Sequence, residues 1–365
     1  MKFYRREQTR KVAIGSVTIG GGMPVAVQSM TNTDTRDWRA TVRQIKELEE
    51  AGCEIVRVSL PDMESACNVS RIKKNIKIPL VADIHFDYRI ALEAVKQGAD
   101  KIRINPGNIG SEDNVSILVK EAQKAHIPIR IGVNAGSLKA VHNFSDAASR
   151  AEVLVGSAME HVGILEKHGF FDIVVSLKAS NIDTTIQAYK IFASKRNYPL
   201  HLGITESGSL FNGTVKSAAG IGIMLYSGIG DTVRVSLTAD PVEEVKAAYS
   251  ILQSLELRSS GIEIISCPTC SRTCVDLIKI VADIEKETAQ IKDLKKLSKP
   301  LKVAVMGCTV NGPGEAKDAD FGIAGGKDGG VLFKHGRIIG KVKTDDWVPK
   351  IISMIKCCLN DNSED

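Results

Sequence analysis

The sequence predicts an α/β fold in which a closed (β/α)8 TIM barrel is followed by a smaller α+β domain. Eight short apolar runs are each followed by a stretch of helix length whose apolar residues lie three and four positions apart. The runs are apolar enough to be covered on both faces, which favours a barrel over the alternative, an open doubly wound sheet. They begin near Val25, Glu54, Pro79, Asp100, Pro128, Asp172, Pro199 and Asp231.

A small hairpin is expected ahead of the first run, and helices are expected between the runs. Residues 12–20 alternate around Gly15 and Ser16 like two short strands, and this hairpin is placed to plug the N-terminal end of the barrel. The clearest helical stretches are residues 41–51, 88–97, 114–125, 151–167 and 242–255.

The regular alternation of strands and helices stops near residue 257, which marks a change of domain. We expect the barrel to cover residues 1–258, with the hairpin plug in residues 1–23, and a second domain to cover residues 259–365. The second domain has the pattern strand, helix, strand, hairpin and closing helix, the first four at residues 262–265, 275–291, 301–306 and 331–342.

The composition is that of an ordinary globular protein. Charged residues make up 25% of the 365 residues, the net charge is +5, and no basic block with interleaved aromatic residues points to nucleic acid. The N-terminus runs directly into charged residues, and no segment reaches the roughly 18 apolar residues of a membrane span. We therefore expect a cytoplasmic protein without nucleic-acid or membrane partners, in which the eight cysteines do not form disulfides.

Polar side chains alternate with apolar ones along six of the predicted strands. In residues 102–105 the two isoleucines share one face, while Arg103 and Asn105 share the other. In a barrel this polar face is the interior, and its C-terminal end is where barrel enzymes place their active sites. The other polar pairs are Arg57 with Ser59, Asp83 with His85, Arg130 with Asn134, Ser176 with Lys178, and Arg234 with Ser236.

The predicted mouth of the barrel has more cations than anions. An excess of about three cations in a largely dehydrated pocket would cost several kcal/mol per unpaired ion, unless a polyanionic ligand offsets it. A diphosphate fits because guanidinium groups bind phosphate oxygens in pairs, although any single arginine is equally well explained by a structural ion pair. The basic residues are Arg57, Arg103, Arg130, Lys178 and Arg234, and the acidic ones are Asp83 and Glu206.

Two polar groups at the strand ends are candidates for catalysis. Glu206, after the seventh strand, suits a general acid/base because a desolvated carboxylate can have its pKa raised; pairing with an arginine explains it equally well. His85, two residues after Asp83, could bind a metal as in a zinc hydrolase. A single Asp-x-His is a weak signal, and a hydrogen-bonded pocket histidine is the favoured interpretation.

Two loops of the second domain carry the most specific signal in the chain. Cys267-Pro-Thr-Cys270 is followed by a loop that runs from Cys308 to Glu315. Three thiols and a carboxylate suit an iron-sulfur cluster with one non-cysteine ligand. Structural zinc is the alternative, and it is less favoured because no second CxxC and no ligand-spaced histidine follow.

The other cysteines carry weaker signals. Cys53 and Cys67 are expected to be small core residues. Cys357 and Cys358 lie in the closing helix, where we expect packing or exposure and no metal. Cys274 follows the CxxC loop and offers a further sulfur atom whose role the sequence leaves open.

With these residues, the chain resembles the 4-hydroxy-3-methylbut-2-enyl diphosphate synthase family, the iron-sulfur enzymes of the methylerythritol phosphate route, in its short bacterial form. The resemblance runs essentially end to end. Besides the cysteine loops, the motifs are Val27-Gln-Ser-Met-Thr-Asn-Thr33, Val56-Arg-Val-Ser-Leu-Pro61, Ala82-Asp-Ile-His85, Arg103-Ile-Asn-Pro-Gly-Asn108, Gly132-Val-Asn-Ala-Gly-Ser137 and Gly203-Ile-Thr-Glu206.

The resemblance implies an activity, a cofactor and a set of site residues. The activity is reductive ring opening of 2-C-methyl-D-erythritol 2,4-cyclodiphosphate to the allylic diphosphate, with two electrons passing through a 4Fe-4S cluster. The implied cluster ligands are Cys267, Cys270, Cys308 and Glu315. The implied diphosphate ligands are Arg57, Arg103, Asn105, Arg130, Asn134, Lys178, Arg234 and Ser236, with Asp83, His85 and Glu206 around the reacting carbons.

The resemblance also implies partners. Members are homodimers in which the cluster domain of one subunit closes the barrel of the other, and reduced flavodoxin or ferredoxin supplies electrons. The residues alone leave two other functions open, an iron-sulfur sensor or electron carrier and a zinc-dependent hydrolase of phosphate esters. They do not identify the donor or the reaction intermediate.

Overall fold

The computed structural model describes residues 4–105, 111–138, 144–258, 261–291, 293–294, 297, 300–308, 318–326 and 329–361. The chain divides into two compact units, Met1–Leu257 and Arg258–Asp365. Each unit has an apolar core of its own. Within the described residues, no helix combines the length and apolar character needed to cross a membrane.

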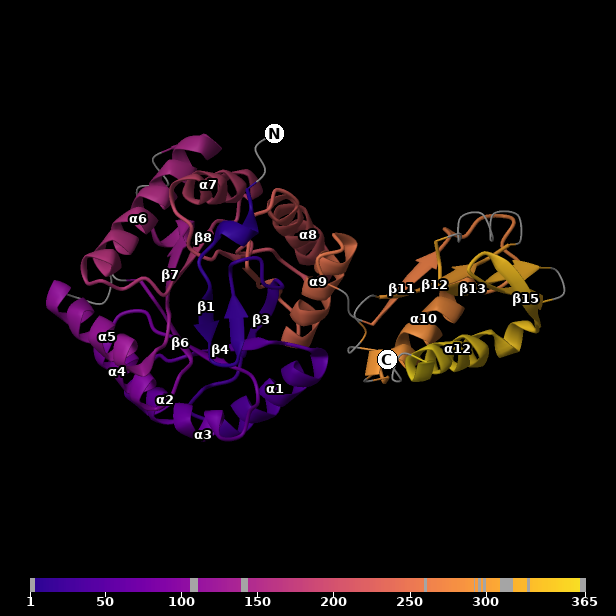
Figure 1. Ribbon diagram of the computed structural model, residues 1–365, viewed down its shortest axis with the longest axis horizontal. Helices are drawn as coiled ribbons and strands as arrows, with labels where there is room; N and C mark the ends of the chain where they lie inside the picture. The colour runs from indigo at the N-terminus through magenta and orange to yellow at the C-terminus, as the bar shows by residue number, and fades with distance from the viewer. Residues whose placement is uncertain are drawn as a thin grey trace. The chain divides into compact units, whose positions relative to one another are not determined.

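The first unit is a ring of eight parallel strands surrounded by helices (Figure 1). The strand order is β8-β7-β6-β5-β4-β3-β10-β9, and a parallel bridge between Val175 and Leu200 closes the ring. The predicted TIM barrel is confirmed. The strands are β3 (Ala26–Met30), β4 (Ile55–Ser59), β5 (Leu80–Asp83), β6 (Lys101–Ile104), β7 (Ile129–Asn134), β8 (Ile173–Lys178), β9 (His201–Leu202) and β10 (Thr232–Val233).

The helices of the barrel begin at polar caps and bury one apolar face on the strands. Asp37, Asp87 and Asp146 each accept a backbone N–H at a helix start, where N–H groups lack partners within the helix. The described helices are η1 (Arg6–Gln8), α1 (Trp38–Ala51), α2 (Met63–Cys67), α3 (Val69–Lys73), α4 (Tyr88–Lys96), α5 (Glu112–Ala125), η3 (Ala135–Ser137), α6 (Ala147–Lys167), α7 (Ile182–Lys195), α8 (Leu210–Tyr226) and α9 (Pro241–Ser254).

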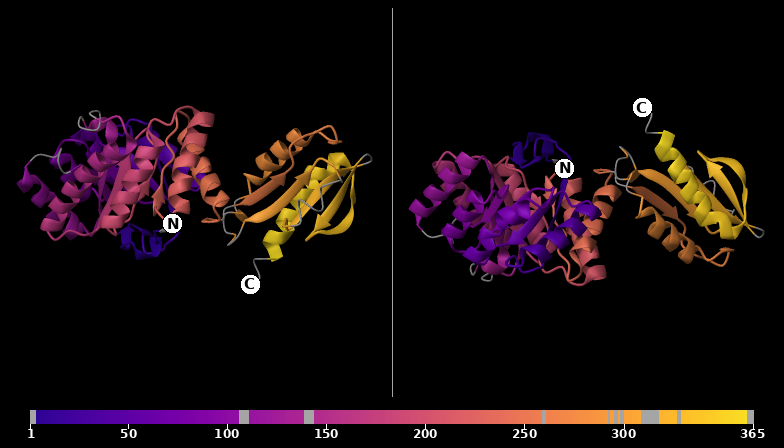
Figure 2. Two further views of the ribbon diagram at one scale, coloured as in Figure 1. Left: turned by 90° about the horizontal axis from the view of Figure 1, so that it is seen from above. Right: turned by 90° about the horizontal axis from the view of Figure 1, so that it is seen from below.

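The hairpin ahead of the barrel consists of the antiparallel strands β1 (Val12–Ile14) and β2 (Val17–Ile19). Its buried apolar side chains pack against Ile55, Val81 and Val174, which point inward near the beginnings of their strands. Figure 2 shows this indigo hairpin at one end of the barrel. An apolar layer therefore lies beneath the polar interior.

The second unit is built on a five-stranded sheet in the order β11-β12-β13-β14-β15, with β11, β12 and β13 parallel and the rest antiparallel. The sequence did not predict β13, because its glycines weaken the strand pattern. A Cβ atom at Gly322 would lie 2.4 Å from the Ala304 oxygen, so the close packing of this strand requires glycine. The elements are β11 (Ile262–Ser266), α10 (Leu277–Thr288), β12 (Leu301–Met306), β13 (Phe321–Gly326), β14 (Gly329–Lys334), β15 (Arg337–Val342), η6 (Thr344–Asp346) and α12 (Trp347–Asp361).

The two faces of this sheet differ. Helices α10 and α12 pack on one face around the fully buried Trp347. The other face has a smaller apolar cluster that includes Met306 and Phe333. Cys267 packs against the clusters of both faces, so the CxxC loop begins at the end of β11, in contact with both.

Candidate active site

The barrel interior is polar, as the alternation of side chains predicts. Ile102 and Ile104 belong to the core between strands and helices, whereas Arg103 between them contacts Asp83 of the neighbouring strand. The same alternation separates the outward Val56 and Val58 from the inward Arg57 of β4.

Asp83 is the centre of the polar network at the mouth. Its carboxylate lies 3.4 Å from Arg57 Nη2, 3.2 Å from Arg103 Nη1 and 3.4 Å from His85 Nε2. Burial alone would raise the pKa of Asp83, but Arg57, His85 and Arg103 together hold it well below its usual range. The group is therefore an anion that orients the cations around it.

His85 has its two ring nitrogens beside two different partners. Nδ1 lies 3.3 Å from Arg103 Nη1, and Nε2 faces Asp83. Half of the side chain remains exposed. This is the arrangement of a hydrogen-bonded pocket histidine, the interpretation that the sequence favours.

Two glycines of the sequence motifs make room for the basic side chains. A Cβ atom at Gly132 would lie 2.5 Å from Arg103 Nε, and one at Gly203 would lie 2.5 Å from Lys178 Nζ. Arg103 also donates to the Gly132 carbonyl oxygen at 3.0 Å. Glycine at these positions thus leaves room for the side chains of Arg103 and Lys178 to lie against the neighbouring strands.

Arg234 is held by groups that the sequence did not single out. It lies 3.4 Å from both carboxylate oxygens of Glu244, a buried residue of α9 that also accepts from Ser29 Oγ at 3.0 Å. Met30 Sδ lies 3.6 Å from Arg234 Nη1 and 3.0 Å from Arg57 Nε. Glu244 is an inward carboxylate on a helix, so the strand alternation could not reveal it.

Several predicted ligands are buried without a partner among the described residues. Arg130 is 1% exposed, and its Nε and Nη1 atoms make no hydrogen bond, nor does Asn105 Oδ1. Burial, followed by repulsion from neighbouring cations, lowers the pKa of Arg130 and of Lys178 well below their usual values. Asn134, the last residue of β7, and Ser236, three residues after the end of β10, are half-buried. Buried polar groups of this kind need a ligand or water to bond with.

A second polar layer lies closer to the hairpin, and the sequence analysis missed it. Lys101, Gln28 and His201 are at most 1% exposed, and Lys101 Nζ, the Gln28 amide and His201 Nε2 have no partner in the described part of the chain. His201 Nδ1 lies 2.7 Å from Thr232 Oγ1. Lys101 lies two residues before Arg103 on the same strand, so the alternation of side chains predicts that both point into the barrel. This alternation was the signal in the sequence.

Glu206 differs from its expected environment. Its side chain is exposed, so it is not desolvated within this chain, and no ion pair joins it to a mouth arginine among the described residues. Its backbone has φ +52°, a left-handed conformation that is uncommon for a residue other than glycine. Such conformations concentrate at functional positions.

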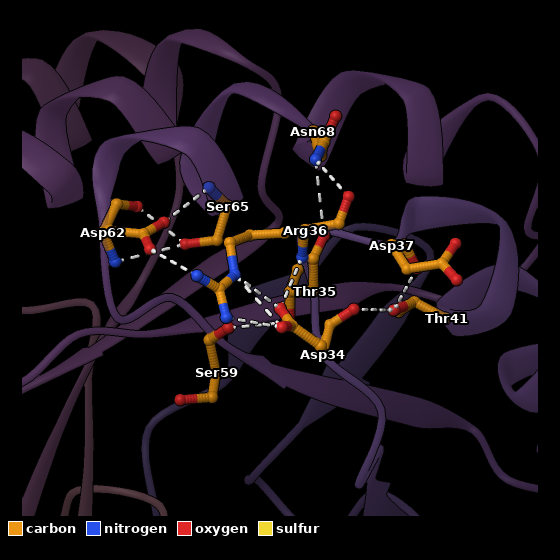
Figure 3. Close-up of polar contacts among 9 residues, drawn as sticks. All are labelled: Asp34, Thr35, Arg36, Asp37, Thr41, Ser59, Asp62, Ser65 and Asn68. Atoms are coloured by element: carbon orange, nitrogen blue, oxygen red, sulfur yellow. Dashed lines mark hydrogen bonds and ion pairs between the residues drawn. The ribbon is translucent and has the colours of Figure 1, made fainter.

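The rim of the mouth after β3 is fixed by a dense polar network (Figure 3). Arg36 makes a bidentate pair with Asp34, with its shortest distance 2.6 Å, and Nη1 lies 3.9 Å from Asp62. Thr35 Oγ1 donates to the Ser59 carbonyl at the end of β4. These contacts connect the segment after β3 to the end of β4 and the residues that follow it.

The structure brings the two cysteine loops of the second unit together. Gly307 N–H donates to Cys267 Sγ at 3.4 Å, and Cys274 N–H donates to the Gly307 oxygen at 3.0 Å. Cys308 is therefore adjacent to the CxxC loop. Hydrogen bonds from the backbone and side chain of Arg272 lower the pKa of Cys270, which favours the thiolate that metals bind.

The metal site itself is only partly described. Glu315 lies outside the described residues, and in the part of the chain that is described no three His, Cys, Asp or Glu side chains are grouped to hold a metal ion. The donor set fits an iron-sulfur cluster because N–H groups directed at sulfur are among the features that tune such clusters.

The remaining cysteines divide by burial. Cys53 is buried as predicted, and burial raises the pKa of its thiol to about 12. Cys67 was expected in the core, and this prediction was wrong: it is exposed at the end of α2, because the short helix turns its apolar face away from it. Cys357 is exposed and Cys358 half-buried on α12.

Solved structures resemble the barrel at the level of the fold. Dihydropteroate synthase of Stenotrophomonas maltophilia aligns with a TM-score of 0.53 and 15% identity over 68% of this chain and 98% of that chain. The enzyme of Yersinia pestis aligns with a TM-score of 0.51 and 14% identity over 67% and 98%. At this identity the likeness shows the fold alone.

Two family models and many curated relatives match the chain. The models are the GcpE TIM-barrel domain, over residues 9–249, and the GcpE protein C-terminal domain, over residues 263–357. A protein of Caldanaerobacter subterraneus subsp. tengcongensis is 56% identical over 96% of this chain and 97% of its own length. One of Clostridium acetobutylicum is 55% identical over 96% and 99%. Both are named 4-hydroxy-3-methylbut-2-en-1-yl diphosphate synthase (flavodoxin). The chain therefore belongs to the GcpE family, which confirms the resemblance inferred from its motifs.

Proposed function

We propose that the barrel binds 2-C-methyl-D-erythritol 2,4-cyclodiphosphate and that the protein reduces it to (E)-4-hydroxy-3-methylbut-2-enyl diphosphate. Two electrons and two protons open the ring and release one oxygen as water. The observation that carries this proposal is the interior charge, because among the described residues six basic side chains face two carboxylates. The basic residues are Arg57, Lys101, Arg103, Arg130, Lys178 and Arg234, and the carboxylates are Asp83 and Glu244.

The free donors of the mouth are the proposed diphosphate ligands. Arg57, Arg103 and Arg234 are oriented by the two carboxylates, which leaves other N–H groups of each guanidinium for the ligand. Arg130 and Lys178 lack a carboxylate partner among the described residues, and Asn105, Asn134 and Ser236 add neutral contacts. Phosphate oxygens would satisfy the buried donors that otherwise destabilise the fold.

Asp83, His85 and Glu206 are the proposed residues around the reacting carbons. His85 is half-exposed between an anion and a cation, so it can hold a proton at Nε2 that Asp83 accepts. Glu206 is exposed on the loop after β9, where it is accessible to a substrate in the mouth. We assign it the role of general acid/base.

A 4Fe-4S cluster is proposed on Cys267, Cys270, Cys308 and Glu315. When bound, the cluster supplies single electrons and an iron with an exchangeable ligand, which thiols and carboxylates of the protein cannot provide. The chain contributes the thiolates, the Gly307 N–H bond to Cys267 and the basic residue Arg272 beside Cys270. An electron carrier without substrate would need the cluster but would leave the cationic interior unexplained.

A homodimer is proposed with flavodoxin or ferredoxin as electron donor and a cytoplasmic location. Helix α8 supports self-association because apolar side chains along it are exposed to solvent: Phe211 is 76%, Val215 54% and Ile223 47% exposed. The names of the relatives favour flavodoxin. Sedimentation of Phe211→Glu against the unmodified protein tests the interface: it should give a monomer.

The test of the proposed function uses anaerobically purified protein with its cluster. Reduced protein should convert the cyclic diphosphate to the linear allylic diphosphate, detected by mass spectrometry, and Cys308→Ser should lose both brown colour and turnover. Iron and zinc analysis separates this function from the zinc hydrolase, which would release inorganic phosphate without reductant. Full turnover by a colourless, iron-free protein would refute the proposal.

A further inference from the structure

Lys101 lies one layer below the proposed diphosphate ligands and has no established role in the site. It is two residues before Arg103 on β6 and pairs in register with Val81, whose side chain packs on the hairpin plug. Its side chain is fully buried, and Nζ has no hydrogen-bond partner among the described residues. Asp100, its neighbour in the chain, accepts instead from Lys73 and from the Leu80 N–H.

The groups that face this layer are cationic or neutral. Arg57 of β4 and Arg130 of β7 both repel a charge on Lys101, and His201 of β9 is repelled in turn by Lys101. Lys178 of β8 belongs to the same cluster of basic groups, and burial followed by repulsion from Arg130 lowers its pKa as well. On β3 and β10 the facing residues of this layer are the neutral Gln28 and Thr232, and the hairpin beneath presents apolar side chains.

The described acidic groups around the layer are engaged elsewhere. Asp231, which precedes Thr232, accepts from the Leu200 N–H and from Thr9 Oγ1. Asp83 of β5 bonds to Arg57, Arg103 and His85, and Glu244 of α9 bonds to Arg234 and Ser29. Burial, followed by repulsion from Arg130 and then Arg57, lowers the pKa of Lys101 well below its usual value. Without ligand, burial and the neighbouring cations therefore favour the neutral form of this amine.

We propose that Lys101 couples substrate binding to proton uptake: its amine accepts a proton when the cyclic diphosphate enters the mouth above it. This inference rests on the proposed function for the identity of the ligand. The negative charge of the ligand offsets Arg57 and Arg130, which removes the repulsion that keeps Lys101 neutral. Lys101 does not contact the ligand, because it lies below the cations that do. It acts on binding through its charge and is therefore a positioning residue.

The proposal predicts a pH dependence of affinity. If binding takes up about one proton, the dissociation constant rises up to about tenfold for each unit increase in pH, in the range where free Lys101 is neutral and bound Lys101 is charged. The ligand itself does not contribute, since each phosphorus of a cyclic diphosphate carries one strongly acidic group that stays ionised throughout this range.

Isothermal titration of the oxidised holoenzyme with the cyclic diphosphate measures this uptake. Without reductant there is no turnover, and the slope of binding enthalpy against buffer ionisation enthalpy gives the number of protons. We expect the proton uptake of the unmodified protein to exceed by about one proton the uptake of both Lys101→Met, which is never charged, and Lys101→Arg, which is always charged. Lys120→Met, on the exposed face of α5, is the matched control and should retain the full uptake.

The two variants protect the test against a simple loss of folding. Met fills nearly the same volume without an unpartnered amine, so thermal denaturation should show a stable Lys101→Met protein. If that variant fails to fold, the proton uptake of Lys101→Arg and the pH dependence of affinity in the unmodified protein still test the inference. Uptake that is undiminished in either folded variant, or an affinity of the unmodified protein that is independent of pH, overturns the inference. Absence of saturable binding by the unmodified protein would instead refute the proposed function.

Discussion

Replacing Gly132 by alanine is the most direct test of how the barrel positions its cations. The new Cβ atom would lie 2.5 Å from Arg103 Nε, 2.9 Å from Nη2 and 3.1 Å from Cζ. Ordinary contacts between such atoms are about 3.5 Å or longer, so the guanidinium must move by about 1 Å. The nearest atoms all belong to one flexible side chain, so the strand itself can remain in place.

The movement breaks the bonds that fix Arg103. The guanidinium bonds to the Gly132 oxygen at 3.0 Å and to Asp83 at 3.2 Å, and a shift of this size weakens both. A misplacement of about 1 Å in a positioning group can lower catalysis about 100-fold, which is about 2.7 kcal/mol of transition-state stabilisation. We expect kcat/KM of Gly132→Ala to fall by about this factor, while the cluster spectrum stays unchanged.

The assay is steady-state formation of the allylic diphosphate by reduced protein, with thermal denaturation as the check on folding. Gly136→Ala is the matched control, because no atom lies within 4 Å of its added Cβ and the position is a few residues further along the same segment. It should retain normal kinetics. A Gly132→Ala protein with unchanged kcat/KM would refute the argument that this glycine exists to accommodate Arg103.

Other residues give further expectations. Glu244→Gln removes the charge that holds Arg234, and we expect KM to rise about tenfold because one charge-assisted pair is worth about 1.5 kcal/mol; unchanged KM would contradict the role of this carboxylate. In cluster-free protein, iodoacetamide should label Cys270 before Cys53, since hydrogen bonds lower one thiol pKa and burial raises the other to about 12; peptide mass spectrometry measures the order. Burial raises the pKa of Asp231 to about 6, above its usual 3.8, so its contribution favours folding below pH 3.8 and is lost as pH rises through 6. The free energy of unfolding of Asp231→Asn, measured at several pH values, should therefore vary with pH by up to about 3 kcal/mol less than that of the unmodified protein. The same pH profile in both proteins would contradict this contribution of Asp231.

The features that followed from backbone geometry were predictable from the sequence. Side chains alternate along any strand, so the inward placement of Arg103 and Arg130 required only the correct strand assignment. The cysteine loops were likewise found from the sequence, because the candidate ligands within each loop lie close together along the chain. The prediction of strand β13 failed because Gly322 and its neighbours carry little strand propensity, and their packing depends on contacts far along the chain.

The missed parts of the site come from tertiary contacts. Glu244 reaches Arg234 from a helix, and Met30 lies between two arginines that are far apart in sequence. Glu206 was expected to be desolvated or paired, but its exposure depends on how the loop after β9 folds. Lys101 shares the parity of Arg103, yet only the structure shows that no carboxylate reaches it among the described residues.

The hairpin plug explains why the excess positive charge of the barrel interior is accessible to a ligand from the mouth and not from the base. Water at the base of the barrel would solvate Lys101 and Arg130 and reduce the electrostatic free energy that a ligand gains. The apolar layer of the hairpin against Ile55, Val81 and Val174 excludes water on that side. The uncompensated cations can then be neutralised only from the C-terminal end of the strands. Under the proposed function, the charges that destabilise the free barrel would contribute binding free energy for a doubly phosphorylated ligand, and the buried amine of Lys101 beneath them would take up a proton when it binds.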